Sequence, residues 1–275
     1  SHLEAEVPLG AFLSGGLDSS TVVALMSRHA SGRVRTFSIG FAEEAYDESA
    51  AARAVAAELG ADHTELILRP NVEDTFEAIA VMFDEPLADP SAIPNFFVAQ
   101  LARQSVTVAL SGDGGDELFG GYTRYRKTLA HEAGRGGGLR RLVSTLGLML
   151  PRIFPGRNRL IDFGRSRWGR YAAMVVQPVR LDEGGIARTD QPGAAIHIED
   201  QLRDRVCLEL GDDFAAAMMQ MDVETYLPGD ILTKVDRTSM AVSLEARVPL
   251  LDFDLVDFAL QIPGKSRVTA DESKR

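Results

Sequence analysis

Cysteine is almost absent from this chain of 275 residues, in which Cys207 is the only example. A lone cysteine cannot form an intramolecular disulfide or a cysteine-rich metal site. We interpret Cys207 as a packing residue rather than a nucleophile. Because a chain without disulfides fits a reducing compartment, the sequence predicts a cytoplasmic protein.

Long hydrophobic runs are also missing. No apolar stretch approaches the roughly 18 residues that cross a bilayer, and residues 1–4 (SHLE) do not have the pattern of a signal peptide. We therefore expect no membrane segment. Hydrophobic residues still make up 45% of the chain, which is enough for a packed core. The length allows one large or two modest domains.

Basic residues are outnumbered by acids, which gives a formal net charge of −11, but they gather in one segment. Residues 124–180 hold 13 Arg and Lys against two acids, Glu132 and Asp162. A basic segment of this kind can bind nucleic acid. Little aromatic interleaving accompanies the charge, so we favour a solvated helical segment that faces an acidic neighbour, and we do not expect nucleic-acid binding.

The first 123 residues alternate between strand-like and helix-like patterns. We expect strands at residues 7–13, 34–41, 63–68 and 106–110, and helices at residues 17–29, 48–59, 72–83 and 91–104. Gly60 stands where a glycine ends a helix, and Ser91 stands where an N-cap begins one. The alternation predicts an α/β fold, a parallel sheet flanked by helices, with ligands bound beyond the carboxyl ends of the strands.

The pattern becomes mainly helical after residue 123, and we expect helices at residues 213–226, 230–243 and 252–261. We therefore divide the chain into an α/β core, residues 1–123, and a mainly helical part of the same domain, residues 124–275. Residues 271–275 resemble a helix start that has been cut, so we expect the natural domain to continue.

The first of two glycine-rich loops, residues 14–20 (SGGLDSS), connects an expected strand to an expected helix. The N–H groups and partial positive charge of a helix start attract anions, and glycine permits their close approach. Asp18 would repel phosphate unless a cation lay between them. The loop lacks the lysine of a Walker A motif. A plain strand-to-helix connection is the alternative, but we predict a magnesium-bridged pyrophosphate site.

The second loop, residues 111–122 (SGDGGDELFGGY), follows the strand expected at residues 106–110 and holds Asp113, Asp116 and Glu117. Acidic clusters in turns are often only solvated, but one or two carboxylates suffice to hold Mg²⁺. Two like charges about 4 Å apart cost about 4 kcal/mol at an effective dielectric constant of 20. Because a divalent ion between them reverses that sign, we expect Asp18 and Asp116 to share a Mg²⁺ ion.

The first loop resembles the phosphate loop of the ATP pyrophosphatases, the PP-loop family, which split ATP between the α and β phosphates. Together with the second loop and residues 244–252 (LEARVPLLD), it resembles the synthetase domain of glutamine-hydrolysing asparagine synthetases. The resemblance implies a PP-loop fold, ATP and Mg²⁺ as cofactors, and a ligase. Such a ligase adenylates the side-chain carboxylate of aspartate and transfers ammonia to it, which gives asparagine.

The resemblance also implies roles for single residues. Asp113 falls where the family has an acid proposed to assist ammonia attack, although the best-known members carry Glu there. Lys274 falls where a lysine stabilises the departing charge, and Lys234 is a second candidate for that role. The residues implied to bind ATP and pyrophosphate are Phe12, Ser14, Gly15, Gly16, Asp18, Ser19, Ser20, Ile39, Ser111 and Gly112.

The sequence leaves open which acid is the acceptor and which partners the protein has. The resemblance implies ammonia released from glutamine by an N-terminal glutaminase domain, which these residues do not include, so free ammonia or a partner is expected. Relatives amidate sugars, peptides or other acids, and the acceptor acid cannot be identified from spacing. An RNA-modifying PP-loop enzyme and a fragment that binds nucleotide without turnover are the other hypotheses. The sequence does not define the oligomeric state, and a homodimer is one expectation.

Overall fold

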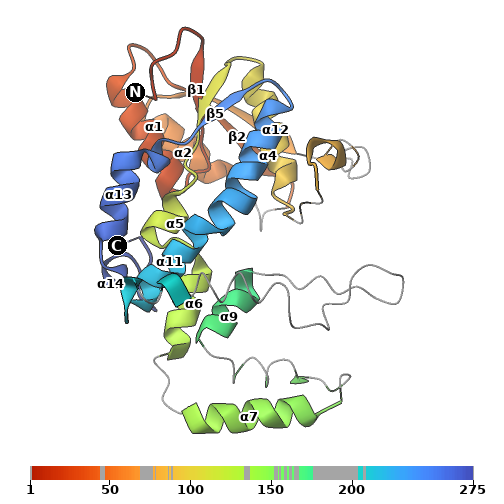
Figure 1. Ribbon diagram of the computed structural model, residues 1–275. Helices are drawn as coiled ribbons and strands as arrows, with labels where there is room; N and C mark the ends of the chain where they lie inside the picture. Colours follow the sequence, from red (N-terminus) through yellow and green to blue (C-terminus); the bar gives the residue numbers. More distant parts are fainter. Residues whose placement is uncertain are drawn as a thin grey trace. The chain divides into compact units, whose positions relative to one another are not determined.

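A computed structural model gives the fold of this chain (Figure 1). The residues that it describes are 2–43, 47–68, 77, 79–85, 87, 89–132, 137–151, 154, 156–157, 160, 163, 167–175, 204–206 and 209–274. Several sequence predictions lie wholly or partly outside these residues. They are the packing role of Cys207, half of the helix expected at residues 72–83, and part of the basic segment 124–180.

The chain folds into two compact units that do not follow the order of the sequence. The first unit is formed by Ser1–Asp116 and Val223–Ala259, and the second by Glu117–Asp222 and Leu260–Arg275. The second half of the chain therefore contributes about 40 residues to the unit that holds the expected α/β core. The division at residue 123 stays a prediction about domains.

A five-stranded, all-parallel sheet forms the centre of the first unit, and its strand order is β3-β2-β1-β4-β5. The strands are β1 Leu9–Phe12, β2 Arg35–Phe41, β3 Asp62–Leu68, β4 Val108–Leu110 and β5 Glu245–Arg247. The α/β prediction is confirmed, and the four expected strands are present. The fifth strand was not predicted.

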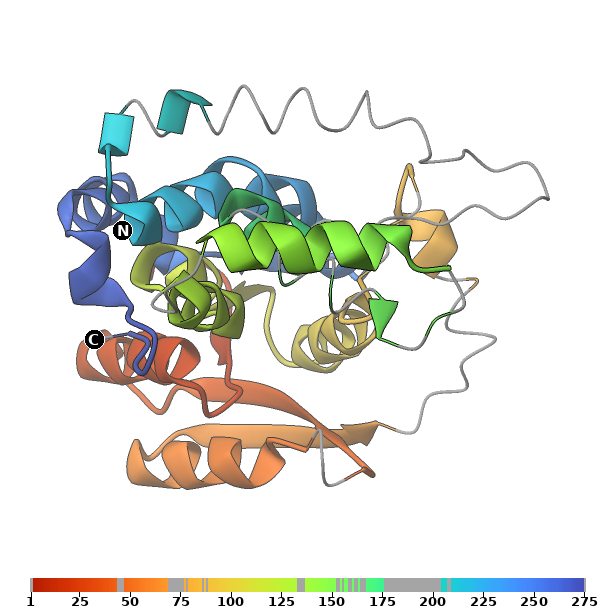
Figure 2. The ribbon, with the colours of Figure 1, turned by 90° about the horizontal axis from the view of Figure 1, so that it is seen from below.

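Helices cover both faces of this sheet (Figures 1 and 2). On one face, α1 Leu17–His29 and α2 Ser49–Glu58 pack their apolar residues against Ala11 and Leu13. On the other face, Phe37 and Ala109 pack against α4 Ala92–Arg103. Side chains alternate between faces along a strand, so β1 and β2 each contribute to both cores. This burial on two sides is typical of parallel sheets.

A further helix of the first unit, α12 Thr233–Met240, packs against α4 and β5. It continues directly from η1 Leu227–Leu232, a π-helical turn that contains Pro228. Proline has no N–H to donate, and π-turns occur frequently at functional sites. The unit also includes the 3₁₀ turn η2 Pro249–Leu251 and the helix α13 Phe253–Gln261, whose last two residues belong to the second unit.

The second unit is helical in the residues that the structure describes. Its elements include α6 Thr123–Glu132, α7 Gly137–Met149, α9 Arg167–Val175, α11 Phe214–Glu224 and α14 Gly264–Arg267, and α5 Gly115–Phe119 lies at the junction of the units. Its core contains Tyr125, Tyr171, Met218 and Met219. Within the described residues, no helix has both the length and the apolar character to cross a membrane.

Candidate nucleotide-binding site

The two glycine-rich loops lie at the same edge of the sheet. Strands β1 and β4 are parallel neighbours in which Ala11 pairs with Leu110, so the two chains leave the sheet side by side. The Ser14 loop (residues 14–20) follows β1, and the Ser111 loop (residues 111–122) follows β4. This edge, beyond the carboxyl ends of the strands, is where ligands bind in open α/β sheets.

The Ser14 loop is held in shape by its own hydroxyl groups. The Ser14 and Ser19 hydroxyl oxygens lie 3.0 Å apart, Ser14 N–H donates to Ser19 Oγ over 3.2 Å, and Gly16 N–H donates to Ser14 Oγ over 3.2 Å. Gly15 has a φ of +79°, which favours glycine, and a β-carbon there would lie 2.7 Å from the backbone of Ala51. Gly16 begins α1 without a side-chain cap, so the first N–H groups of α1 remain available to an anion.

Ser20 differs from the other serines of this loop. Its Oγ is buried and has no hydrogen-bond partner among the described residues. Ser20 lines a separate open groove between α1 and α2, together with Thr21, Ala24, Ala54, Val55, Glu58 and Leu59. The structure therefore does not bring the Ser20 side chain to the cavity that Ser14 lines, and its role in phosphate binding stays a prediction.

The two loops touch each other through glycines. A β-carbon at Gly112 would lie 2.8 Å from the backbone nitrogen of Ser19. A β-carbon at Gly115 would lie 2.4 Å from Cγ of Asp18 and 2.7 Å from both of its carboxylate oxygens. Contacts this short are not tolerated between real atoms. Glycine at these two positions is therefore what allows the Ser111 loop to lie directly against the start of α1.

Three carboxylates of the first unit influence one another here. Burial is the main cause that raises the pKa of the Asp113 carboxyl, and the charges of Asp116 and Asp18 add to the rise, whereas the hydrogen bond from Ser111 and the charge of Lys234 oppose it. Among the described residues, no group of three or more His, Cys, Asp or Glu side chains is arranged to hold a metal by itself. Mg²⁺ needs only one or two carboxylates beside water and phosphate oxygens, so the carboxylate chemistry of Asp18 and Asp116 is compatible with that ion, and their role as its ligands stays a prediction.

The third acid of the loop, Glu117, belongs to the second unit. It is 1% exposed, and its Oε1 accepts a hydrogen bond from the Tyr122 hydroxyl over 2.6 Å. A buried carboxylate that is bonded in this way holds the end of the loop in place.

A cavity of about 860 Å³ opens beside the two loops, and the described residues that line it all belong to the first unit. Five of the candidate residues named from sequence line it: Phe12, Ser14, Ile39, Asp113 and Lys234. The other lining residues are Leu13, Phe37, Ser38, Phe41, Glu48, Ala52, Pro90, Ser91, Pro94, Asn95 and Val98. Its walls are therefore apolar around Phe12 and Ile39, with polar groups toward Ser14 and Asp113, as ligand cavities commonly are.

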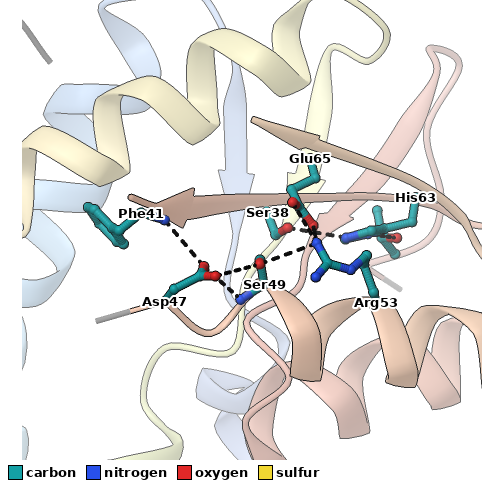
Figure 3. A network of polar contacts seen from close by, with 8 residues as sticks. Ser38, Phe41, Asp47, Ser49, Arg53, His63 and Glu65 are labelled. Atoms are coloured by element: carbon teal, nitrogen blue, oxygen red, sulfur yellow. Dashed lines mark hydrogen bonds and ion pairs between the residues drawn. The ribbon is translucent and has the colours of Figure 1, made fainter. Parts of the chain in front are cut away.

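Asp47, which sequence reasoning missed, fixes one edge of this cavity (Figure 3). Its Oδ1 accepts from the N–H groups of Phe41 and Ser49 over 3.2 and 3.1 Å, and its Oδ2 accepts from the Ser49 hydroxyl over 2.9 Å. The hydrogen bonds from Ser49 are the main cause that lowers the pKa of Asp47. Asp two residues before Ser at a helix start is the signal that could have identified this turn. Arg53 of α2 contacts the same Ser49 and pairs with Glu65 over 2.7 Å.

His63 joins two neighbouring strands of the sheet. Its Nδ1 lies 2.9 Å from Thr36 Oγ1 and its Nε2 lies 3.2 Å from Ser38 Oγ, as Figure 3 shows for Ser38. Burial is the main cause that lowers the pKa of this imidazole. A neutral ring between two hydroxyls holds β2 and β3 together and supports Ser38 at the cavity wall.

The two candidate lysines lie in different units. Lys234 of α12 lines the cavity, and its ammonium lies 2.6 Å from Asp89 Oδ2 and 2.8 Å from Ser91 Oγ. Lys274 belongs to the second unit, where its φ is +52°. Its role stays a prediction, as do the roles of the remaining loop residues.

Residues 244–252 support the site through β5. The Ser111 N–H donates to the carbonyl of Arg247 over 2.8 Å. The Arg247 guanidinium pairs with Glu245 over 2.6 Å and donates to the carbonyls of His2 and Glu4, each over 2.9 Å. Arg247 and Glu245 therefore form an internal ion pair.

The comparisons with known proteins agree with this arrangement. The family model described as asparagine synthase matches residues 1–275. Asparagine synthetase [glutamine-hydrolyzing] 1 of Bacillus subtilis is 34% identical over 281 residues, which cover 99% of this chain and 43% of that protein. A putative asparagine synthetase [glutamine-hydrolyzing] of Mycobacterium tuberculosis is 38% identical over 290 residues, which cover 99% of this chain and 42% of that protein.

A shorter match comes from an archaeon. Putative asparagine synthetase [glutamine-hydrolyzing] 2 of Methanocaldococcus jannaschii is 44% identical over 123 residues, or 44% of this chain and 24% of that protein. The chain thus spans less than half the length of these curated relatives. The family match across all 275 residues, on a parallel sheet with both glycine-rich loops at one edge, shows that the chain belongs to the asparagine synthase family.

Proposed function

We propose that this chain is the synthetase part of an ATP-dependent, amide-forming ligase. It adenylates the side-chain carboxylate of aspartate, with release of pyrophosphate, and ammonia derived from glutamine then displaces AMP to give asparagine. The observation that carries this proposal is the contact of the two loops, in which Gly112 and Gly115 lie against Ser19 and Asp18 at the start of α1, while Ser14 and Asp113 of the same loops line a nucleotide-sized cavity. Family membership supports the same chemistry.

The nucleotide would lie along the cavity. The apolar side chains of Phe12 and Ile39 suit an adenine ring. The hydroxyl-rich Ser14 loop and the first N–H groups of α1 suit the phosphates. Asp18 and Asp116 are the residues that would hold Mg²⁺, which, when bound with ATP, would offset the charge on the β- and γ-phosphates.

In the first step, a carboxylate oxygen of the acid attacks the α-phosphorus of ATP. The bond between the α-phosphorus and the bridging oxygen breaks, and its electron pair leaves with pyrophosphate. The N–H groups at the start of α1 stabilise this developing negative charge without having to reorganise. The adenylate that forms has AMP as a good leaving group, so one difficult amide formation becomes two easier steps.

In the second step, ammonia attacks the acyl carbon, and the bond from that carbon to the AMP oxygen breaks. The nitrogen must lose a proton as the amide forms. Asp113 lines the cavity, and burial raises the pKa of its carboxyl. A raised pKa makes a carboxylate a stronger proton acceptor. We therefore assign Asp113 the role of receiving that proton.

Exchange of labelled pyrophosphate into ATP, measured in the natural full-length protein, tests the proposal. We expect exchange that depends on aspartate and falls at least 100-fold in Asp18→Asn, because the pair of carboxylates that binds the cation is lost. The matched control is Asp62→Asn, which removes one exposed carboxylate at the start of β3. Exchange with another carboxylic acid but none with aspartate would refute the substrate, and exchange with no acid would refute the ligase.

A further inference from the structure

Among the described residues, Lys234 is the only cationic one that lines the cavity. It is 7% exposed as a residue, and its side chain pairs with an Asp89 side chain that is 16% exposed. Burying a charge to this extent costs free energy unless the charge is paired and hydrogen-bonded. Pairing with Asp89 offsets the cost of burying Lys234, but it does not explain why a buried cation lies at the wall of a ligand cavity.

The lysine is held in place from several directions. The Asp89 carboxylate that accepts from its ammonium also accepts from the Ser91 N–H and from the Ser91 hydroxyl, each over 2.8 Å. On the side of α12, the Thr233 hydroxyl donates to the Pro228 carbonyl of the preceding π-turn over 2.8 Å. Desolvation of Asp89 is outweighed by its hydrogen bonds, chiefly that from Lys234, and the pKa of this carboxyl is lowered.

The ammonium of Lys234 has donor capacity that these contacts do not use. A lysine ammonium has three N–H donors, and two acceptors, Asp89 Oδ2 and Ser91 Oγ, contact Nζ within the described part of the chain. The residue lines the cavity, and its charge lowers the pKa of Asp113, which lines the same cavity. A third N–H is therefore available to an anionic ligand near Asp113.

We propose that Lys234 binds a carboxylate of the acceptor acid and orients that acid toward Asp113 and the nucleotide. This inference rests on the proposed ligase function. In the proposed function, the phosphates are bound by another element, the Ser14 loop at the start of α1. Asp89 and Ser91 act through Lys234 as positioning residues.

The test compares three variants of the full-length protein in the exchange assay. In Lys234→Met, the KM for aspartate should rise about 10- to 100-fold, the loss typical of a hydrogen bond to a charged group, while the Kd of MgATP stays within about twofold. Lys234→Arg should recover part of the loss, because it keeps the charge. Arg237→Met is the matched control, since it removes another cation of α12 whose partner, Asp84, is exposed.

Loss of one partner leaves Asp89 without its cation, so folding must be followed separately. The double variant Asp89→Asn/Lys234→Met removes both charges and should recover the melting temperature without recovering the KM for aspartate. Recovery of both quantities would refute the inference, because it would make the lysine purely structural. An unchanged KM for aspartate in a folded Lys234→Met protein would refute it equally.

Direct binding distinguishes failure of this inference from failure of the proposed function. Aspartate is titrated calorimetrically into protein saturated with magnesium and α,β-methylene-ATP, which cannot be cleaved between the α and β phosphates. Binding that weakens in Lys234→Met supports the inference whether or not exchange occurs. If Lys234→Met instead weakens binding of the nucleotide analogue and leaves aspartate binding unchanged, Lys234 is a phosphate ligand and the inference is refuted. Absence of aspartate binding to the unaltered protein would overturn the inference as well.

Discussion

Gly115→Ala is the substitution in which the contact between the two loops can be tested most sharply. The added β-carbon would lie 2.4 Å from Cγ of Asp18, and ordinary contact between carbon atoms is about 3.5 Å. The Asp18 carboxylate must therefore move by about 1 Å. It is the end of a side chain and can rotate away, so we expect a loss of stability near the lower limit of overpacking, about 1 kcal/mol.

The functional loss should be much larger than the loss of stability. Misplacing a binding or catalytic group by about 1 Å can reduce a rate about 100-fold, so pyrophosphate exchange should fall by about that factor. Gly32→Ala is the matched control, since no atom lies within 4 Å of the β-carbon that it adds. Both variants are compared by exchange rate and by melting temperature. Unchanged exchange in Gly115→Ala, with an unchanged melting temperature, would refute the contact and the role of Asp18 derived from it.

Two further predictions concern stability. Asp222 is 0% exposed and accepts hydrogen bonds from Arg124 over 2.6 Å and from the hydroxyls of Tyr125 and Tyr171. Asp222→Ala should lower the free energy of unfolding in urea by about 3–5 kcal/mol, because it removes the buried carboxylate that these three side chains share. A loss below about 1 kcal/mol would contradict this. Burial and the charge of Asp89 raise the pKa of Asp230, whose Oδ1 has no partner among the described residues. The folded state therefore holds this proton more tightly than the unfolded state, and stability decreases as pH rises above about 4. Asp230→Asn should raise the melting temperature at pH 7 more than at pH 4, and the opposite order would refute the assignment.

The elements predicted well from sequence are those whose ends carry local signals. The helix expected at residues 17–29 is α1 Leu17–His29, because a glycine loop begins it. Gly60 follows α2 with a φ of +64°, as a helix-ending glycine should. Ser91 does occupy the N-cap of α4, but its hydroxyl makes no capping hydrogen bond and contacts Asp89 and Lys234 instead. The serine at position 91 therefore indicated correctly where the helix begins, but it did not indicate which residues its hydroxyl would contact.

The features that sequence reasoning missed depend on contacts between distant segments. Strand β5 has three residues, Glu245–Arg247, with no alternation of apolar and polar side chains, and it is a strand only because it pairs with β4. The pairing of Lys234 with Asp89 joins residues 145 positions apart. Periodicity reports which face of an element is buried but not which element covers it. For this reason the return of Val223–Ala259 to the first unit was not predicted.

That return also explains what residues 244–252 contribute to the site. Strand β5 pairs with β4, and the Arg247 carbonyl accepts the N–H of Ser111 just where the Ser111 loop begins. A β-carbon at Gly114, whose φ is +86°, would lie 2.4 Å from the side chain of Leu251. The Ser111 loop is thus confined between α1 on one side and the segment after β5 on the other. A loop that must hold two carboxylates in place gains its geometry from such support, so residues 244–252 contribute to the site by fixing this loop.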